Sequence, residues 1–241
     1  MKKITYVIIS VIVLFLASCT DDSGEYSQKL FSNSDISEAL RQCLICCSDS
    51  ANYHLSVPDT TAFGYYNYED GKYRITLSAA AFIFDTLRNN EHGDLVDMFI
   101  YQINNSASGI SIEMSDYFKS VRSDIKFEDP SAILYGSQKA LTNYFEKNYS
   151  FPFITTISST LSSYFTKQEI YTLWNELLSI YANYSSQPVN IDLQWQIAQQ
   201  MVDGFIKEMG IEEVNVRTLV SHRGATNTTL YRVFATLDPP Q

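Results

Sequence analysis

Residues 190–210 read NIDLQWQIAQQMVDGFIKEMG, and their pattern predicts a long α-helix. Apolar side chains recur in this stretch every three or four residues, which is the spacing of one face of a helix. That face comprises Ala198, Met201, Val202, Phe205, Ile206 and Met209. We expect the helix to begin at Asn190 and to end at Gly210, because glycine commonly follows the last helical turn.

The same helical spacing recurs in other segments of the chain. Asp35 and Glu38 form a capping box, which should open a helix that runs to about Ser48. Thr166 and Glu169 form a second capping box, directly before a clear apolar stripe. The stripe comprises Ile170, Leu173, Trp174, Leu177, Leu178 and Tyr181. Many helices joined by short connections indicate a multi-helix array or bundle.

A short helix is expected between positions 129 and 136. Asp129-Pro130 places a capping carboxylate before a proline at the first helical position. Gly136 should end this helix in the left-handed conformation, which has a positive φ that glycine adopts without strain. We therefore predict that Gly136 is required for the structure.

Residues 63–77 depart from the helical pattern. Asp70-Gly71 is a strong signal for a hairpin turn, and apolar and polar residues alternate from position 73 to position 77. Both features predict one small β-hairpin. The fold class expected from the sequence is therefore mainly α, a multi-helix array or bundle with one small β-hairpin near residues 63–77.

The N-terminus reads as a targeting segment. Lys2 and Lys3 form a basic start, and residues 6–16 are apolar apart from a single serine. This run is too short to cross a hydrocarbon core, which needs about 20 apolar residues. It fits the hydrophobic region of a secretory signal peptide. The ending Leu16-Ala17-Ser18-Cys19 resembles the bacterial lipobox, in which the cysteine is lipidated and becomes the first mature residue.

The lipobox divides the chain into three expected parts. Residues 1–18 form a lipoprotein signal peptide, residues 19–33 form a lipidated Cys19 with a flexible polar tether, and residues 34–241 form a single helical domain. Two or three acyl chains anchor a protein stably without spanning the bilayer. We expect an outer-membrane lipoprotein of a Gram-negative cell envelope, either periplasmic or surface-exposed, that contacts the membrane through its N-terminal lipid.

Composition narrows the expected partners. The chain of 241 residues has a formal net charge of −10 and no basic stripe, so we expect no binding to nucleic acid, whose phosphates an acidic surface repels. Aromatic residues make up 14% of the chain, while glycine and proline are few. This composition favours a packed, helix-rich domain over a disordered chain.

Several short segments occur together in a recognisable order. They are Asn104-Asn105-Ser106-Ala107, Phe127-Glu128-Asp129, Ile133-Leu134-Tyr135-Gly136, Ala140-Leu141-Thr142-Asn143-Tyr144-Phe145, Glu212-Glu213 with Val216-Arg217, and Thr229-Leu230-Tyr231-Arg232-Val233-Phe234. In their order and spacing they resemble the domain of unknown function 4197 family, over roughly residues 35–236. The resemblance implies a mostly helical protein that is secreted or lipid-anchored in bacteria. The family has no established activity, so the resemblance supplies no catalytic residue.

Cysteines are the first candidates for chemistry. Cys43, Cys46 and Cys47 include a Cys-x-x-Cys pattern, and His54 could supply a fourth metal ligand. Cys43 and Cys47, however, lie on the apolar face of a predicted helix, where cysteines usually behave as small buried hydrophobes. We therefore predict free thiols, no metal and no cofactor.

A second set of candidates consists of polar residues on otherwise apolar helices. Glu213 and Arg217 are four residues apart, so they form either an ordinary helical ion pair or a buried pair that lines a pocket. Asn104, Thr142 and Tyr144 either bridge helices by hydrogen bonds or face a ligand cavity. The sequence does not separate these alternatives.

Known catalytic motifs are missing from the sequence. There is no Gly-x-Ser-x-Gly elbow, no P-loop and no pair of histidines at metal-ligand spacing. We name no catalytic residue and favour a non-enzymatic binding or scaffolding module, tethered to a membrane, with an envelope protein as partner. Two alternatives stay open: a carrier of a small apolar ligand in an inter-helix cavity, and a hydrolase with a dispersed site.

Overall fold

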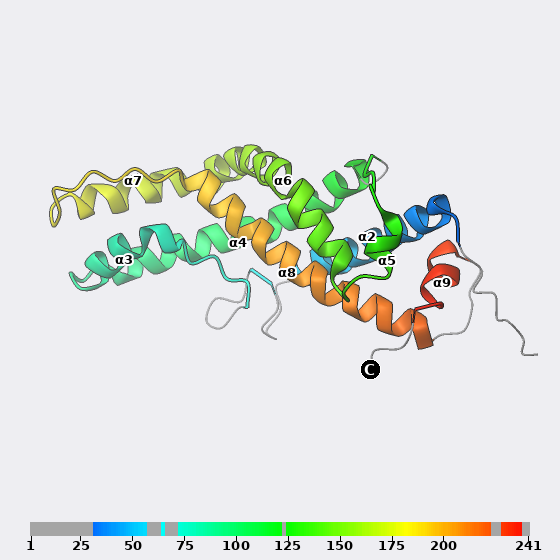
Figure 1. Cartoon of the computed structure of the whole chain (residues 1–241). Helices are drawn as coiled ribbons and strands as arrows, with labels where there is room; N and C mark the ends of the chain where they lie inside the picture. Colours follow the sequence, from blue (N-terminus) through cyan, green and yellow to red (C-terminus); the bar gives the residue numbers. More distant parts are fainter. Residues whose placement is uncertain (1–30, 57–63, 66–71, 122–123, 223–227, 238–241) are drawn as a thin grey trace, which may run out of the picture. The chain divides into compact units, whose positions relative to one another are not determined.

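A computed structural model describes residues 31–56, 64–65, 72–121, 124–222 and 228–237 (Figure 1). These residues contain eight α-helices, one short 3-10 helix and no strand, so the prediction of a mainly α fold is confirmed. The chain from Asn33 onwards forms one compact unit. In the described ranges, no helix combines the length and the apolar character that crossing a membrane requires.

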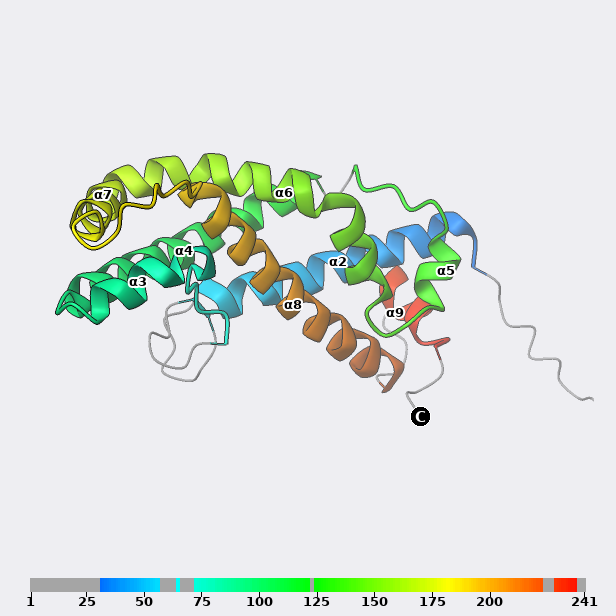
Figure 2. The same cartoon turned by 60° about the vertical axis from the view of Figure 1, so that its left-hand side comes forward.

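The helices pack around a central group formed by α2, α4, α6 and α8. Their bounds, with those of the shorter elements, are α2 Asn33–Ser56, η1 Ser78–Ala80, α3 Ala81–Arg88, α4 Gly93–Val121, α5 Pro130–Leu134, α6 Ala140–Lys167, α7 Ile170–Tyr181, α8 Leu193–His222 and α9 Thr229–Phe234. Helix α8 contacts both α2 and α6, and α2 also contacts α4 and α9. Figures 1 and 2 place α3 with α7 at one end of this unit and α5 with α9 at the other.

Aromatic side chains fill the centre of this group. Phe118 of α4 lies 4.9 Å from Phe145 and 5.1 Å from Phe205, measured between ring centroids. Phe153 of α6 completes the cluster at 5.4 Å from both Phe118 and Phe205. Offset and edge-to-face contacts of this kind stabilise a core beyond the burial of apolar area alone. The high aromatic content of the sequence is therefore used, at least in part, for packing.

Helix α8 differs from its prediction at both ends. It begins at Leu193, where the Asp192 carboxylate accepts a hydrogen bond from the Trp195 backbone N–H at 3.0 Å. It does not stop at Gly210 but continues to His222. A Cβ at Gly210 would lie 3.4 Å from Lys139 Cδ, an ordinary contact distance, so this glycine neither ends the helix nor is required there by space.

The two predicted capping boxes also fail. Helix α2 begins at Asn33, so Asp35 lies inside its first turn, and the helix extends to Ser56. Thr166 lies in the last turn of α6, where its hydroxyl donates to the Ser162 carbonyl at 3.0 Å. Glu169 is the N-cap of α7 but has a φ of 55° and no side-chain capping bond. The Thr166 hydroxyl therefore bonds within α6 and does not cap α7.

The boundary at α5 follows the sequence more closely. Asp129 is the N-cap, its carboxylate accepts the Ala132 backbone N–H at 2.9 Å, and Pro130 is the first helical residue. The predicted positive φ at Gly136 is wrong, because among the described glycines only Gly64 has one. Gly136 is instead confined by space: a Cβ there would lie 2.7 Å from the Ala132 carbonyl oxygen. The requirement for glycine stays a prediction, with a different physical reason.

The predicted β-hairpin near residues 63–77 is not supported. Residues 64–65 and 72–77 contain no strand, and Asp70-Gly71 lies outside the described residues. The predicted alternation is nevertheless present, since Tyr73, Ile75 and Leu77 are buried. Among the described residues, side chains of two helices, and no second strand, pair with the backbone of this segment.

Asn104 of α4 takes the place of the second strand. The Ile75 N–H donates to Asn104 Oδ1 at 2.8 Å, and Asn104 Nδ2 donates to the Ile75 carbonyl at 2.9 Å. Gln200 of α8 accepts the next two backbone N–H groups, at 3.2 and 3.3 Å. Side-chain amides carry the same donor and acceptor groups as a backbone peptide, so they satisfy an extended segment equally well.

Candidate functional site

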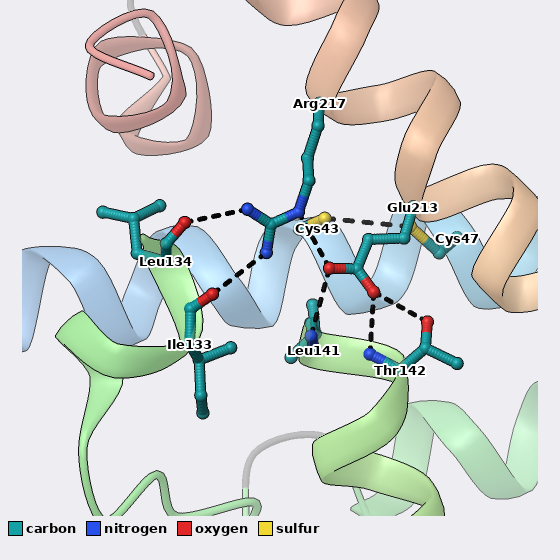
Figure 3. Close-up of polar contacts among 8 residues, drawn as sticks. All are labelled: Cys43, Cys47, Ile133, Leu134, Leu141, Thr142, Glu213 and Arg217. Carbon is teal, nitrogen blue, oxygen red and sulfur yellow. Dashed lines mark hydrogen bonds and ion pairs between the residues drawn. The ribbon is translucent and has the colours of Figure 1, made fainter. Parts of the chain in front are cut away.

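Helix α8 carries two pairs of charged residues at the same spacing of four positions: Glu208 with Glu212, and Glu213 with Arg217. The second pair is deeply buried, with exposed fractions of 0% for Glu213 and 7% for Arg217. Arg217 Nε donates to Glu213 Oε1 at 2.8 Å (Figure 3). Each partner also binds the backbone of another helix, which the spacing in the sequence could not show.

Glu213 binds the start of α6. Its Oε1 accepts the Leu141 N–H at 3.1 Å, and its Oε2 accepts both the N–H and the hydroxyl of Thr142 at 2.7 Å. The first N–H groups of a helix have no partner inside the helix, and the helix dipole favours a negative charge there. The N-cap residue of α6, Lys139, makes no side-chain capping bond. Glu213 therefore caps α6 from a neighbouring helix.

Arg217 binds the end of α5. Its two terminal nitrogens donate to the carbonyl groups of Leu134 at 2.9 Å and Ile133 at 3.2 Å. These carbonyls belong to the last residues of α5, where positive charge is favoured by the helix dipole. The guanidinium carbon also lies 5.3 Å from the centroid of the Phe234 ring of α9. Arg217 thus joins α8 to both α5 and α9.

We call Glu213, Arg217 and Thr142, with the backbone groups that they bind, the helix clamp. Both carboxylate oxygens of Glu213 accept two hydrogen bonds, and all three guanidinium nitrogens of Arg217 donate one. A surface hollow of about 370 Å³ beside α6 is lined in part by Thr142 and Gly210, but by neither member of the ion pair. This arrangement favours helix bridging over a role in a pocket.

Two cysteines of α2 lie close to the helix clamp (Figure 3). Cys43 Sγ and Cys47 Sγ are 3.7 Å apart and buried, whereas Cys46 is exposed, and all three are free thiols. The hydrogen bond with Cys43, together with burial, raises the pKa of the Cys47 thiol well above its ordinary value. A raised pKa keeps this thiol protonated at neutral pH, which disfavours a nucleophilic role.

Asn104 and Tyr144 also contact backbone groups. Beyond its two bonds to Ile75, Asn104 donates to the Ile100 carbonyl at 2.8 Å. Tyr144 donates its hydroxyl proton to the Lys126 carbonyl at 2.5 Å, and its ring lies 5.5 Å from that of Phe127. Burial raises the pKa of Tyr144, so the hydroxyl remains a donor at neutral pH. Both side chains connect elements that are distant in the sequence.

The structure also brings together three residues that sequence analysis did not group: His54 of α2 with Glu208 and Glu212 of α8. We call them the acidic histidine cluster. His54 Nδ1 lies 2.8 Å from Glu208 Oε1 and 3.8 Å from Glu212 Oε1. On its other oxygen, Glu208 accepts a hydrogen bond from the Tyr73 hydroxyl and lies 3.8 Å from Lys72 Nζ.

No pattern in the sequence predicted this cluster. His54 and Glu208 are 154 positions apart. The predicted helix that opens at Asp35 ended at about Ser48, so it did not include His54. The predicted end of α8 at Gly210 also placed Glu208 and Glu212 on different elements. Only a helix that continues through Gly210 puts both glutamates on one face, as residues at positions i and i+4.

Comparison with known proteins identifies the family. A family model described as "Protein of unknown function (DUF4197)" matches residues 30–235. The chain belongs to the DUF4197 family. The resemblance inferred from the sequence is thereby confirmed. No curated protein matches the DUF4197 chain. The search of solved structures also finds no match.

The segments that carried the DUF4197 resemblance supply the helix clamp. Ile133 and Leu134 come from one segment, Leu141 and Thr142 from the next. Glu213, Arg217 and Phe234 come from the last two. In this chain, four of the six family-like segments thus meet at one place in the fold, where their contacts join helices.

Proposed function

We propose that this DUF4197 protein is a membrane-tethered, non-enzymatic helical binding or scaffolding module of the bacterial cell envelope. The observation that carries the tether is the ending Leu16-Ala17-Ser18-Cys19 after a short apolar run. Acylation of Cys19 would hold the helical unit at an outer-membrane surface, as lipid anchors do when two or more chains insert.

The helix clamp supports a scaffolding role over a catalytic one. Glu213 and Arg217 are the most deeply buried ion pair among the described residues, and their polar atoms are occupied by helix ends. Catalytic acids and bases need polar atoms that reach a substrate. A carboxylate whose two oxygens already accept hydrogen bonds from other helices holds those helices in place. Fixed helix positions are what a scaffold requires.

The packing of the aromatic core argues against the alternative that the protein carries a small apolar ligand. Aromatic side chains can line a cavity for an apolar ligand. Phe118, Phe145, Phe153 and Phe205 instead fill space between three helices by packing against one another. This supports the scaffold over the carrier. The hydrolase alternative is favoured by one observation, the convergence of His54 with two glutamates.

The tether is tested by Cys19→Ala in the full chain, expressed in a Gram-negative bacterium. The wild type should fractionate with membranes and carry acyl chains on its mature N-terminus, as mass spectrometry would detect. The variant should appear in the soluble fraction or as an uncleaved precursor. Cys46→Ala is the matched control, because Cys46 is exposed on α2, and this variant should stay in the membrane fraction. Unchanged fractionation of Cys19→Ala, with no acyl mass on the wild type, would contradict the proposal.

A further inference from the structure

We propose that the acidic histidine cluster, His54 with Glu208 and Glu212, binds a single divalent transition-metal ion such as zinc. This goes beyond the proposed tethering and scaffolding function. It also departs from the expectation, drawn from the sequence, that the chain holds no metal. Histidine nitrogen and carboxylate oxygen are ligands that zinc accepts, and three protein ligands with one open position are common at non-structural zinc sites.

The distances between the donor atoms suit such an ion. One ligand atom from each residue lies within 4.8 Å of the other two. With zinc–ligand bonds of about 2.0–2.2 Å, two donors of a tetrahedral site lie about 3.4 Å apart. The observed separations from His54 Nδ1, 2.8 Å to Glu208 and 3.8 Å to Glu212, fall on either side of that value. The two separations from His54 thus bracket the value that a tetrahedral zinc site requires.

Two rigid elements present the ligands. Glu208 and Glu212 are one turn apart on α8, and His54 lies in the last turn of α2, which packs against α8. The side chain of His54 is 36% exposed and that of Glu212 is 13% exposed, so an ion has a path from solvent. Glu208, at 2% exposed, forms the buried side of the site.

A neighbouring residue orients the buried ligand. Tyr73 donates its hydroxyl proton to Glu208 Oε2, and Lys72 Nζ lies 3.8 Å from the same oxygen. The other oxygen, Oε1, is the one that faces His54. Partners of this kind fix the direction of a metal-ligating carboxylate.

The local charge also favours a cation. With a neutral imidazole, two carboxylates and one ammonium group leave the cluster with a surplus negative charge. Without an ion, His54 Nδ1 and Glu208 Oε1 form a direct hydrogen bond at 2.8 Å. A metal ion would replace this hydrogen bond by two metal–ligand bonds, and its binding can be measured.

The experiment titrates zinc into the full chain, purified in detergent and stripped of metal by a chelator, with calorimetry as the readout. The wild type should bind one zinc per chain. His54→Ala and Glu212→Gln each remove a ligand and should weaken binding at least about 10- to 100-fold. Tyr73→Phe acts through the positioning of Glu208 and should weaken it about tenfold. Glu208 itself is left unchanged, because its burial makes misfolding of the variant a risk.

Matched controls separate this site from other zinc ligands. His92→Ala removes a histidine that contacts Tyr184, and Cys46→Ser removes the exposed thiol; both should bind zinc as the wild type does. Cobalt substitution should give visible bands without thiolate charge-transfer absorption. Circular dichroism and melting curves of the metal-free variants check that each is folded. The proposal is overturned if the folded wild type binds no stoichiometric zinc, or if folded His54→Ala and Glu212→Gln bind it unchanged.

Discussion

The helix clamp and the acidic histidine cluster begin from the same local pattern, two charged residues four positions apart on α8. Glu208 and Glu213 are five residues apart, which turns them about 140° from each other around the helix at about 100° per residue. One pair consequently faces α5 and α6, whereas the other faces the end of α2. The difference between them lies in what surrounds each pair.

We call a pair closed when its polar atoms are hydrogen-bonded within the protein, and open when some of its members reach solvent. The groups that surround a pair decide which of the two it is. Around Glu213 and Arg217, the carboxylate accepts two backbone N–H groups at the start of α6, the Thr142 hydroxyl and Arg217 Nε, while the guanidinium also donates to two carbonyls at the end of α5. Around Glu208 and Glu212, the partners are mainly side chains, and two of the three members reach solvent. A closed pair contributes to stability, while an open pair with surplus charge is able to exchange its partners. Five variants test this contrast, in order of decreasing effect.

Removal of the clamp arginine should have the largest effect. Arg217→Met leaves the Glu213 carboxylate buried without its counter-charge, which should lower the free energy of unfolding by about 3–5 kcal/mol. Urea denaturation followed by circular dichroism measures this. Arg88→Met is the control: Arg88 pairs with Asp97 at the surface, so the cost there should be about 0–1 kcal/mol. Equal losses in the two variants would contradict the closed description of the clamp.

A double variant sharpens the same contrast. Glu213→Gln combined with Arg217→Met removes both buried charges, so its loss of stability should be smaller than the sum of the two single losses. A coupling of about 0.5–3 kcal/mol is typical of residues in direct contact. Additive losses in the denaturation experiment would show that the two side chains act independently.

Loss of the Asn104 amide should come next. Asn104→Leu leaves the N–H and the carbonyl of Ile75 buried without partners, which together should lower the free energy of unfolding by about 2–4 kcal/mol. Melting curves and urea denaturation would both report the change. Asn143→Leu is the matched control, because Asn143 is exposed on α6 and should change stability by less than about 0.5 kcal/mol.

The glycine beside the clamp should give a smaller loss. Gly136→Ala places a methyl group 2.7 Å from the Ala132 carbonyl oxygen and 3.0 Å from Ala140 Cβ. Crowding of this kind costs about 1–3 kcal/mol, seen as a lower melting temperature. At Gly93 the nearest atom to an added Cβ is Arg88 Cγ at 3.9 Å, so Gly93→Ala should be tolerated. A wild-type melting temperature for Gly136→Ala would refute the spatial argument.

The open pair should give the smallest effect on stability. Glu212→Gln in metal-free protein should change the free energy of unfolding by less than about 0.5 kcal/mol, because Glu212 is partly exposed. Melting temperatures with and without zinc measure this, and the difference from the wild type should appear only with zinc. A loss in metal-free protein as large as that of Arg217→Met would erase the contrast between the two pairs.

Much of the fold follows from the sequence, since the apolar face predicted for α8 is buried and Asp129-Pro130 opens α5. Four of the six residues of the stripe predicted for α7 are also buried, while Leu173 and Leu178 are half-buried. Gly210 was misread because a single glycine weakens a helix without ending it, and α8 continues to His222 along its contacts with α2 and α6. The hairpin failed for a related reason. Alternation from position 73 to 77 indicates an extended segment with one buried face, but it does not say what pairs with its backbone.

The candidate sites also divide into contacts that the sequence predicts and contacts that it does not. Spacing alone brought Glu213 and Arg217 together, because both lie on one helix. Their backbone partners, and the approach of His54 to Glu208, depend on contacts between residues that are 71 to 154 positions apart. A single sequence carries no local signal for contacts of that range, so the clamp was half predicted and the acidic histidine cluster was not.

The helix clamp also has an evolutionary consequence. Glu213 and Arg217 bind peptide N–H and carbonyl groups at positions 133, 134 and 141, and these groups exist whatever side chain a position carries. Substitutions at those three positions can therefore accumulate without breaking the contacts, as long as the helices keep their place. Glu213 and Arg217 have no such freedom, because a change in either residue leaves the charge of the other buried without its partner. Selection that preserves the helix clamp should therefore act on Glu213 and Arg217 as a pair, while the side chains at positions 133, 134 and 141 are free to change.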